Sequence, residues 1–386
     1  MGGEFLGYHR ADGRIGVRNH LLVLSVGGLT APTARRIGAA LQGAVTICLP
    51  YSAGLLGEDE RVRRDAVVGF AAHPNVGAAL MVGDNPAFMR DAAQAVAATG
   101  KPYAALTLDD CGHDALTLTD RGLREGARLA IEVSRARRAP APVSALSIGL
   151  ECGRSDPSSG LVANPLLGLV TDRLVAAGGT AMIGETLEWL GAEHLLEKRA
   201  RTPEAATKIR DAVIRREKLA IAYGVDLTGS NPSPTNVASG LSSIEEKSLG
   251  NIAKSGASPI EGLVAYGERP GRPGLWTMDA SAYAPKSVTG FVIAGAQIVL
   301  FTTGVGNSYV SALAPTLKLS ANPETCAALG QQLDFDASAA FRGETGMEES
   351  GAALFSRMIE IASGLSTCGE VLKEGDETVS RFVAAL

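Results

Sequence analysis

The chain has 386 residues, enough for two domains with cores of their own, so it does not need disulfides for stability. Its 36 basic and 41 acidic residues give a formal net charge of −5, which argues against a nucleic-acid-binding protein. The 46 glycines exceed the roughly 27 expected from average usage and predict many tight turns. The five cysteines are irregularly spaced and fit neither a secreted disulfide framework nor a paired zinc motif. With no signal-peptide pattern and no long apolar segment, we expect a cytoplasmic protein that binds neither membrane nor nucleic acid.

In the first third of the chain, short apolar runs alternate with amphipathic helices. This pattern is typical of βαβ units, so we expect an α/β domain over residues 1–138, with a doubly wound parallel sheet and helices on both faces. The expected strands are 21–26, 45–49, 78–82 and 104–108, and the expected helices are 31–41, 61–72, 86–99 and 121–138.

The segment Arg135–Pro142 combines a basic helix end with two prolines, which predicts the end of a helix and a short connection. A second α/β domain is expected over residues 143–386. Its expected strands are 144–150, 180–183, 296–301 and 317–319, and its expected helices are 164–177, 187–199, 203–223, 244–254 and 351–364. Residues 225–243 lack periodicity and are rich in Ser, Pro, Asn and Gly, so we interpret them as a long functional loop.

Polar residues gather where predicted strands end, which is where open α/β sheets bind ligands. The first cluster spans residues 151–160, and its candidates for substrate binding, with the Asn that follows at the predicted helix start, are Cys152, Arg154, Ser155, Ser159 and Asn164. Small residues and the free amides of a helix start suit an anion. The alternative is that these are ordinary turn and cap residues, and that Cys152 is a packed thiol.

Two further clusters follow along the chain. The long loop contributes Asn231 and Asn236, and the helix after it contributes Lys247 and Lys254, which lie seven residues apart on one helix face and could both meet an anionic substrate. A solvated face with Glu–Lys pairs is the alternative. Thr303 and Gly304 follow a buried strand and would present further donors, or simply form a turn.

Five segments in order together resemble the altronate dehydratase and galactarate dehydratase family, from about residue 6 to the C-terminus. They are GYHRADGRIGVRNHLLVL, GLECGRSDPSSGLVANPLLG, NPSPTNVASGLSSIEEKSLGNIAKSG, VLFTTGVGN and LDFDAS. The resemblance implies a lyase that eliminates water from a sugar acid to give a 2-keto-3-deoxy acid. Asp334-Phe335-Asp336 is closer to the altronate pattern and favours a dehydratase.

Full-length members of that family begin with a small domain of the SAF type, and the residues before Gly7 are too few to form one. The resemblance therefore implies the large subunit of a split enzyme with a small SAF-domain partner, in a homo- or hetero-oligomer. The large subunit of a sulfolactate sulfo-lyase is similar too, which makes release of sulfite an alternative reaction. A non-catalytic anion-binding subunit is a third possibility.

The resemblance also implies a divalent metal, iron(II) or manganese(II). Where the family usually has His-x-Tyr-Gly-Cys, this chain reads Leu49-Pro50-Tyr51-Ser52-Ala53-Gly54, and Gly-Cys-Glu is replaced by Gly83-Asp84-Asn85. The soft ligands are thus absent, which argues against the family's metal and leaves any metal ligands unknown.

Removal of a proton next to a carboxylate creates a second negative charge, which a cation must hold. Lys247 and Lys254 fit that role, and Asp156, Glu185 and Glu246 are the candidates for the acid and the base. Arg154 stands where the family more often has glycine, and its guanidinium would match a carboxylate, phosphate or sulfonate of the substrate.

Overall fold

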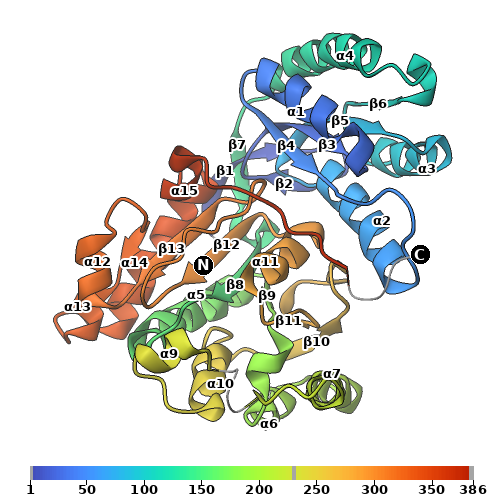
Figure 1. Ribbon diagram of the computed structural model, residues 1–386. Coiled ribbons are helices and arrows are strands. Elements are labelled where there is room, and N and C mark those ends of the chain that lie inside the picture. Colours follow the sequence, from blue (N-terminus) through green and yellow to red (C-terminus); the bar gives the residue numbers. More distant parts are fainter. Residues whose placement is uncertain (1–2, 228–231, 382–386) are drawn as a thin grey trace.

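The computed structural model describes residues 3–227 and 232–381, which form two lobes (Figure 1). The first lobe contains a parallel sheet of order β4-β3-β5-β6, formed by β3 (His20–Ser25), β4 (Ala44–Cys48), β5 (Val76–Gly83) and β6 (Tyr103–Thr107). Leu21 and Val23 of β3 pack against α1 (Ala31–Ala40) and α4 (Ala115–Arg135). Leu22 and Leu24 pack against α2 (Glu58–Ala71) and α3 (Pro86–Ala97) on the opposite face. This alternation confirms the doubly wound sheet with helices on both faces.

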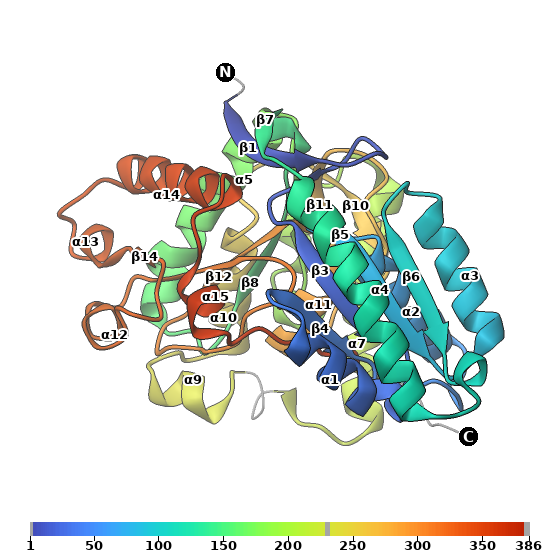
Figure 2. The same cartoon turned by 90° about the horizontal axis from the view of Figure 1, so that it is seen from above.

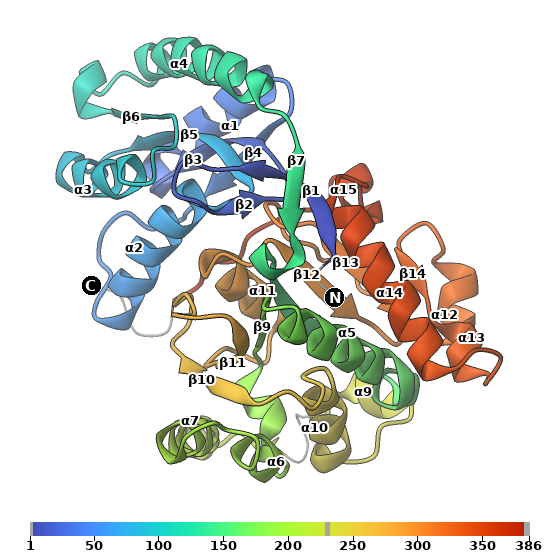
Figure 3. The same cartoon turned by 180° about the vertical axis from the view of Figure 1, so that it is seen from behind.

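A small antiparallel sheet lies between the lobes and corrects one prediction. Helix α4 ends at Arg135 as expected, but the proline-containing segment after it is strand β7 (Ala139–Pro142) rather than a simple connection. It pairs with β1 (Glu4–His9), which also pairs with β2 (Ile15–Gly16). Because β7 is an edge strand, its two prolines can lack N–H donors on the open side. Figure 3 shows β1 and β7 passing between the lobes.

The second lobe is built on a seven-stranded parallel sheet of order β10-β11-β9-β8-β12-β13-β14. Its strands are β8 (Ser147–Cys152), β9 (Thr180–Ile183), β10 (Ile260–Val264), β11 (Gly274–Met278), β12 (Ile298–Thr302), β13 (Thr316–Ser320) and β14 (Phe335–Asp336). All five residues of the central strand β12 are buried, as a sheet covered on both faces requires. The predicted α/β fold class is thereby confirmed here too, as a parallel sheet with interleaved helices.

Helices α5 (Asn164–Ala176) and α14 (Met347–Ala362) cover one face of this sheet, and α11 (Ala284–Ile293) lies on the other. The remaining helices are α6 (Glu193–Glu197), α7 (Pro203–Ala222), α9 (Pro234–Ala238), α10 (Ile244–Ala253), α12 (Pro323–Ala328), α13 (Ser338–Phe341) and α15 (Cys368–Leu372). Helix α9 falls within the stretch interpreted as a loop, where Ser233 and Asn236 form a capping box. Among the residues that the structure describes, no helix is long and apolar enough to cross a membrane.

The two lobes are joined by a shared apolar core and by buried hydrogen bonds. Val67 and Phe70 of α2 belong to the same hydrophobic cluster as Val292 of α11. Nδ2 of Asn75 donates to the carbonyl oxygens of Gln297 and Leu313, at 2.9 Å each. Seen from above, the first lobe and helices α12 to α14 lie at opposite ends of the molecule (Figure 2). The chain after α15 returns to the first lobe, where the guanidinium of Arg381 lies 4.9 Å from the ring centre of Tyr51.

Candidate active site

A cluster of buried polar side chains lies at the carboxyl ends of the central strands of the second lobe. Strand β8 ends at Glu151 and Cys152, and β9 is followed closely by Glu185. The order of the sheet diverges between β8 and β12, because β9 continues to one side and β13 to the other. Open α/β sheets bind ligands at such a switch point.

We call this group the Lys–Glu cluster. It comprises seven residues: Glu151, Cys152, Glu185, Glu188, Lys247, Asn251 and Lys254. Nζ of Lys254 lies 3.0 Å from Oε2 of Glu185 and 3.3 Å from Sγ of Cys152. Nζ of Lys247 lies 2.7 Å from Oε1 of Glu188. The cluster thus contains two ion pairs that are largely removed from water.

Asn251 holds the two ion pairs together. Its Nδ2 donates to Oε2 of Glu185 and to Oε2 of Glu188, both at 3.0 Å. Since Lys247 and Lys254 stand four residues before and three residues after Asn251 on α10, all three side chains share one helix face. Helix α10 therefore supplies the cationic half of the cluster and the strand ends supply the anionic half.

Burial and neighbouring charges set the protonation states of the cluster. Burial and the adjacent Glu185 raise the pKa of Glu151 well above its usual value, which favours the protonated form of this carboxyl. Burial also raises the pKa of the Cys152 thiol. Burial opposes ionisation of Glu185, but the Lys254 ammonium, the hydrogen bonds from Glu151 and Lys254, and the charge of Lys247 together outweigh it, so the pKa of Glu185 is lowered. Glu185 is therefore the firmly ionised member of the carboxyl groups.

The pKa of Glu188 is shifted in the opposite direction to that of Glu185. Burial and the charge of Glu185 raise its pKa, although Lys247 opposes the shift. Burial disfavours the Lys247 ammonium, but the nearby Glu188 more than compensates and the pKa of Lys247 is raised. Two carboxyl groups in one site with pKa values moved in opposite directions are a recognised sign of acid–base chemistry.

The backbone around the cluster departs from ordinary geometry at two places. Glu185 adopts a left-handed conformation with φ of 63° and leads into the short 3-10 helix η5 (Thr186–Trp189), which carries Glu188. Residues Ser159–Ala163 form a π-helical turn directly before α5. Both features are uncommon and concentrate at functional sites.

Two cavities reach the cluster. The larger, about 640 Å³, is lined by Glu185, Glu188 and Lys247 and extends outwards past Arg154 and Tyr309. The smaller, about 210 Å³, lies between the turn before α5 and helix α10. Cys152, Ser155 and Lys247 line both cavities. Lys254 is fully buried and lines neither, so it can support the cluster but not contact a ligand in these cavities.

The structure brings three of the sequence candidates into direct contact, namely Cys152, Glu185 and Lys254, and a fourth, Lys247, joins the cluster through Glu188. Others line the cavities. Arg154, Ser155 and Asn236 line the larger cavity, and Ser155, Asp156, Asn164 and Glu246 line the smaller one. Asn231 lies outside the described residues.

Asp156 and Glu246 are engaged in local hydrogen bonds. Oδ1 of Asp156 accepts from Ser158 and Ser159, and its Oδ2 accepts from Nδ2 of Asn322 at 2.8 Å. Glu246 accepts from the backbone and hydroxyl of Ser242, and the pKa of Glu246 is lowered by those bonds. Neither carboxylate contacts the Lys–Glu cluster in a hydrogen bond that the structure records.

Three other candidates hold the loops together. Ser159 belongs to the cap around Asp156, and the hydroxyl of Thr303 accepts from the backbone of Gly306. A Cβ added at Gly304 would lie 2.5 Å from Asp156, so glycine allows close packing there. None of these three residues lines either cavity.

The expectation of free helix-start amides at Asn164 is wrong. The π-helical turn continues the helix upstream, so those amides do not face an open ligand site. Asn164 instead donates to the carbonyl of Gly250 at 2.8 Å and accepts from the hydroxyl of Thr302 at 2.6 Å. It fixes the distance between β12 and α10.

Sequence reasoning missed Glu151, Glu188 and Asn251. Glu188 follows Glu185 by three residues, and Asn251 lies on the lysine face of α10, so helical spacing could have indicated both. Glu151 sits in an apolar strand, where a single carboxyl group among buried residues was the available signal.

The cluster also contains a group that could hold a metal ion. Cys152, Glu185 and Glu188 each offer a ligand atom, and these atoms lie within 4.8 Å of one another. A thiolate with two carboxylates would suit a borderline divalent ion. The two segments in which the resemblance implies soft ligands do meet, since Ser52 donates to Asp84 at 2.9 Å, but neither residue of this contact is a cysteine.

Comparisons with known proteins match one family along almost the whole chain. The profile described as "D-galactarate dehydratase/Altronate hydrolase, second domain" matches residues 7–134, and that of "D-galactarate/Altronate dehydratase, C-terminal" matches residues 143–384. The beta subunit of (2R)-sulfolactate sulfo-lyase from Chromohalobacter salexigens is 33% identical over 99% of this chain and 98% of its own length. Altronate dehydratase from Escherichia coli is 31% identical over 94% of this chain and 74% of its own length. Galactarate dehydratase (L-threo-forming) from the same organism is 34% identical over 65% of this chain and 46% of its own length.

Proposed function

The chain belongs to the D-galactarate and altronate dehydratase family of lyases, and we propose that it is the large subunit of an enzyme that performs β-elimination on a 2-hydroxycarboxylate. The relatives remove either water or sulfite, as their names state. Both reactions can begin with loss of the proton beside the carboxylate and continue with departure of a group from the next carbon. The observation that carries this proposal is the Glu188–Lys247 ion pair, buried at the switch point and open to the larger cavity.

Lys247 is the proposed partner of the substrate carboxylate. Its raised pKa keeps it cationic, and it can hold the second negative charge that develops when the adjacent carbon loses its proton. Lys254 cannot replace it, because Lys254 lines no cavity and is paired with Glu185.

Glu188 is the proposed base, in preference to the sequence candidates Asp156 and Glu246. When the substrate carboxylate takes the Lys247 ammonium, Glu188 loses its cation while Glu185 remains charged beside it. Its pKa then rises further, so substrate binding itself strengthens the base. We propose that Glu185, which Lys254 keeps ionised, supplies the negative charge that raises the pKa of Glu188.

The proton balance closes within the site. Glu188 accepts the proton from C2, the electron pair forms the C2–C3 double bond, and the group on C3 leaves. When the leaving group is hydroxide, protonated Glu188 can give its proton to it, so water is the product. Sulfite leaves with the electron pair of the C3–S bond, and protonated Glu188 passes its proton to the departing sulfite or to solvent, which regenerates the base. The resulting enol converts to the 2-keto acid.

A sugar acid is the leading substrate class. The larger cavity offers many hydroxyl and amide groups for a polyhydroxylated chain, among them Asn236, Tyr283, Asn307, Ser308 and Tyr309. Arg154 at the same cavity favours a second candidate, a substrate with another anionic group such as a sulfonate. Replacing Arg154 with glycine should shift turnover towards sugar acids that carry no second anionic group, and an unchanged profile over a panel of acids would contradict this role.

A separate small subunit is the proposed partner, in a cytoplasmic enzyme. The chain spans 98% of a relative named as a beta subunit, but 74% of the E. coli altronate dehydratase. About a quarter of the single-chain enzyme thus has no counterpart in the match, and we propose that a SAF-type chain supplies it.

A divalent ion, iron(II) or manganese(II), remains part of the proposal. Cys152, Glu185 and Glu188 would hold it, with Lys254 displaced from the sulfur that it now contacts. When bound, such an ion would polarise a substrate oxygen. The charge stabilisation by Lys247 and the proton transfer by Glu188 described above use only the chain's own residues.

The test is an assay of the protein co-purified with its small partner. Keto acid and sulfite release would be measured over sugar acids and sulfolactate, with and without iron(II). Glu188→Gln should lower kcat by at least about 100-fold, whereas Glu197→Gln, an ion-paired carboxylate on α6, should not. Full activity of Glu188→Gln would remove the proposed base, and absence of turnover on every acid would favour an anion-binding subunit.

A further inference from the structure

A third cavity, of about 310 Å³, lies at the edge of the large sheet opposite to the Lys–Glu cluster. Ser147 and Thr180, the first residues of β8 and β9, line it, so it is at the amino ends of the strands whose other ends carry the active site. Arg14 and Pro74 of the first lobe line it as well. A ligand in this cavity would contact both lobes.

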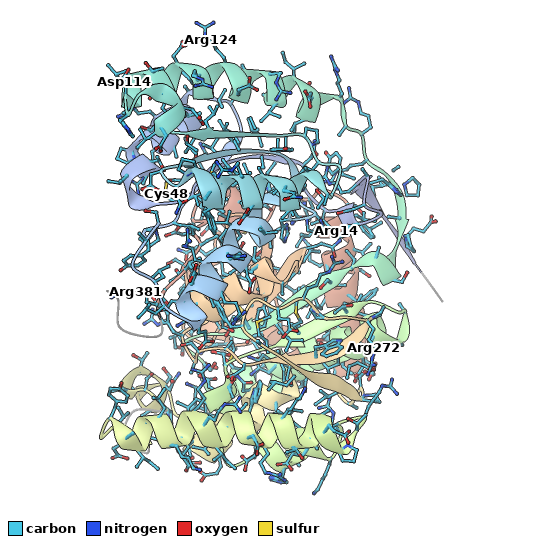
Figure 4. The ribbon with its side chains drawn as sticks, turned by 90° about the vertical axis from the view of Figure 1, so that its right-hand side faces the viewer. Arg14, Cys48, Asp114, Arg124, Arg272 and Arg381 are labelled. Atoms are coloured by element: carbon cyan, nitrogen blue, oxygen red, sulfur yellow. The ribbon has the colours of Figure 1, made fainter. Side chains whose placement is uncertain are left out.

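The walls of this cavity carry an excess of positive charge. Arg14, Arg269 and Arg272 all line it, and Figure 4 shows Arg14 and Arg272 on the same side of the molecule. Arg14 is paired with Asp12. Glu261 neutralises Arg272 only in part, because the same carboxylate is shared with Arg201. With Arg201 included, four arginines therefore lie around only two carboxylates, those of Asp12 and Glu261.

Arg269 is the least compensated of the three. Within residues 3–227 and 232–381, no carboxylate lies within ion-pair distance of its guanidinium. Burial lowers the pKa of Arg269, and repulsion from the positive charge of Arg14 lowers it further, although Asp12 partly opposes the shift. An anion between them would relieve that repulsion.

Two prolines restrict the loop that carries Arg269 and Arg272. The segment Arg269-Pro270-Gly271-Arg272-Pro273-Gly274 repeats Arg-Pro-Gly, and each proline fixes the backbone angle φ directly after an arginine. The prolines therefore lower the conformational entropy that this loop loses when it is ordered around a ligand. Ser144 and Thr180 add hydroxyl groups to the wall that could donate to the same anion.

We propose that this cavity is a second anion site, distinct from the active site, that binds a compact multivalent anion such as phosphate or a dicarboxylate between the two lobes. Such an anion would accept hydrogen bonds from Arg269 and Arg272 on one side and from Arg14 on the other. Because it binds both lobes, the bound anion stabilises their association.

Trp276 gives a direct readout. The Arg272 guanidinium stacks over its ring at 5.8 Å, so capture of Arg272 by an anion should change Trp276 fluorescence. Titrations would use inorganic phosphate and, separately, succinate, against sodium chloride at equal ionic strength. Saturable changes with phosphate or succinate, accompanied by a rise in the unfolding temperature, are expected.

The variant Arg269→Ala/Arg272→Ala should weaken binding at least about tenfold per arginine, since each removes a charge-assisted pair of hydrogen bonds. As Arg272→Ala also alters the fluorophore's surroundings, affinity would be measured by equilibrium dialysis too. The control is Arg124→Ala, an exposed arginine on α4 at the far end of the first lobe (Figure 4). Lys247→Gln, which changes the active site, should retain the stabilisation by phosphate.

Three results would overturn the proposal: affinity in the double variant equal to that of the wild type, an equal loss in Arg124→Ala, or loss of the stabilisation in Lys247→Gln. The first two would show that no built site exists, and the third would place the anion in the active site. A folded double variant, checked by its unfolding temperature without ligand, makes the comparison valid.

Discussion

Replacing Glu185 with glutamine should destabilise the protein strongly, whereas the same change at Glu151 should not. The Lys–Glu cluster is electrically balanced when Lys247 and Lys254 face ionised Glu185 and Glu188 while Glu151 carries a proton. Glu185→Gln leaves the Lys254 ammonium buried without its counter-charge. Glu151→Gln exchanges one neutral group for another of almost the same shape.

The magnitude follows from burial. Side-chain exposure is 0% for Lys254 and 2% for Glu185, so water cannot solvate the charge left behind. Breaking such a pair by removing one partner typically lowers the free energy of unfolding by about 3–5 kcal/mol. The Glu151→Gln change should stay below about 1 kcal/mol, because no charge is created or lost.

Denaturant unfolding followed by tryptophan fluorescence would measure both variants. Trp189 is fully buried in η5, next to Glu188, so its emission reports on the cluster. Equal losses in the two variants would refute the protonated state of Glu151, and a small loss in Glu185→Gln would refute the charge balance. Lys254→Met combined with Glu185→Gln should recover much of the stability, since both charges are then absent.

Three other outcomes are expected. Lys247→Gln should lower kcat/KM for any substrate by about 100- to 1,000-fold, the usual effect of removing one group that stabilises a developing negative charge, as steady-state assays would show. Burial raises the pKa of Glu377 to about 7, so the folded state holds a proton that the unfolded state releases near pH 4.5. The free energy of unfolding should therefore fall between pH 5 and 8, and Glu377→Gln should flatten that slope in urea titrations. Cys152→Ser should lower the iron(II) retained after dialysis, measured by elemental analysis; equal retention would exclude sulfur as a ligand.

The fold was largely predictable because period-2 and period-3.6 patterns are local. The strand starting at Leu21 and the helix starting at Ala31 appear where the sequence predicted them. The pairing of β7 with β1 was not predictable in this way, since it joins residues more than 130 positions apart and two prolines argued for a connection.

The site was predictable only where helical spacing revealed it. The common face of Lys247 and Lys254 is a property of one helix, and the structure brings both to the cluster. Which carboxylates meet them depends on the order of β8, β9 and β12, which no local pattern encodes. Glu246 was therefore a natural candidate by sequence, although its carboxylate is bound to Ser242 at the start of its own helix.

Three unfavourable features coincide at one edge of the second sheet, and their coincidence locates the function. Buried ion pairs are often no more stable than apolar side chains of equal volume, yet two occur here within one cluster. Glu185 holds a left-handed backbone, and a π-helical turn interrupts the helix beside it. Sequences that otherwise satisfy local rules break them mainly at functional sites. At the corresponding edge of the first sheet, Ser52 and Asp84 make a single ordinary hydrogen bond between loops. We therefore assign the proposed elimination chemistry to the second lobe, which shares an apolar core with the first.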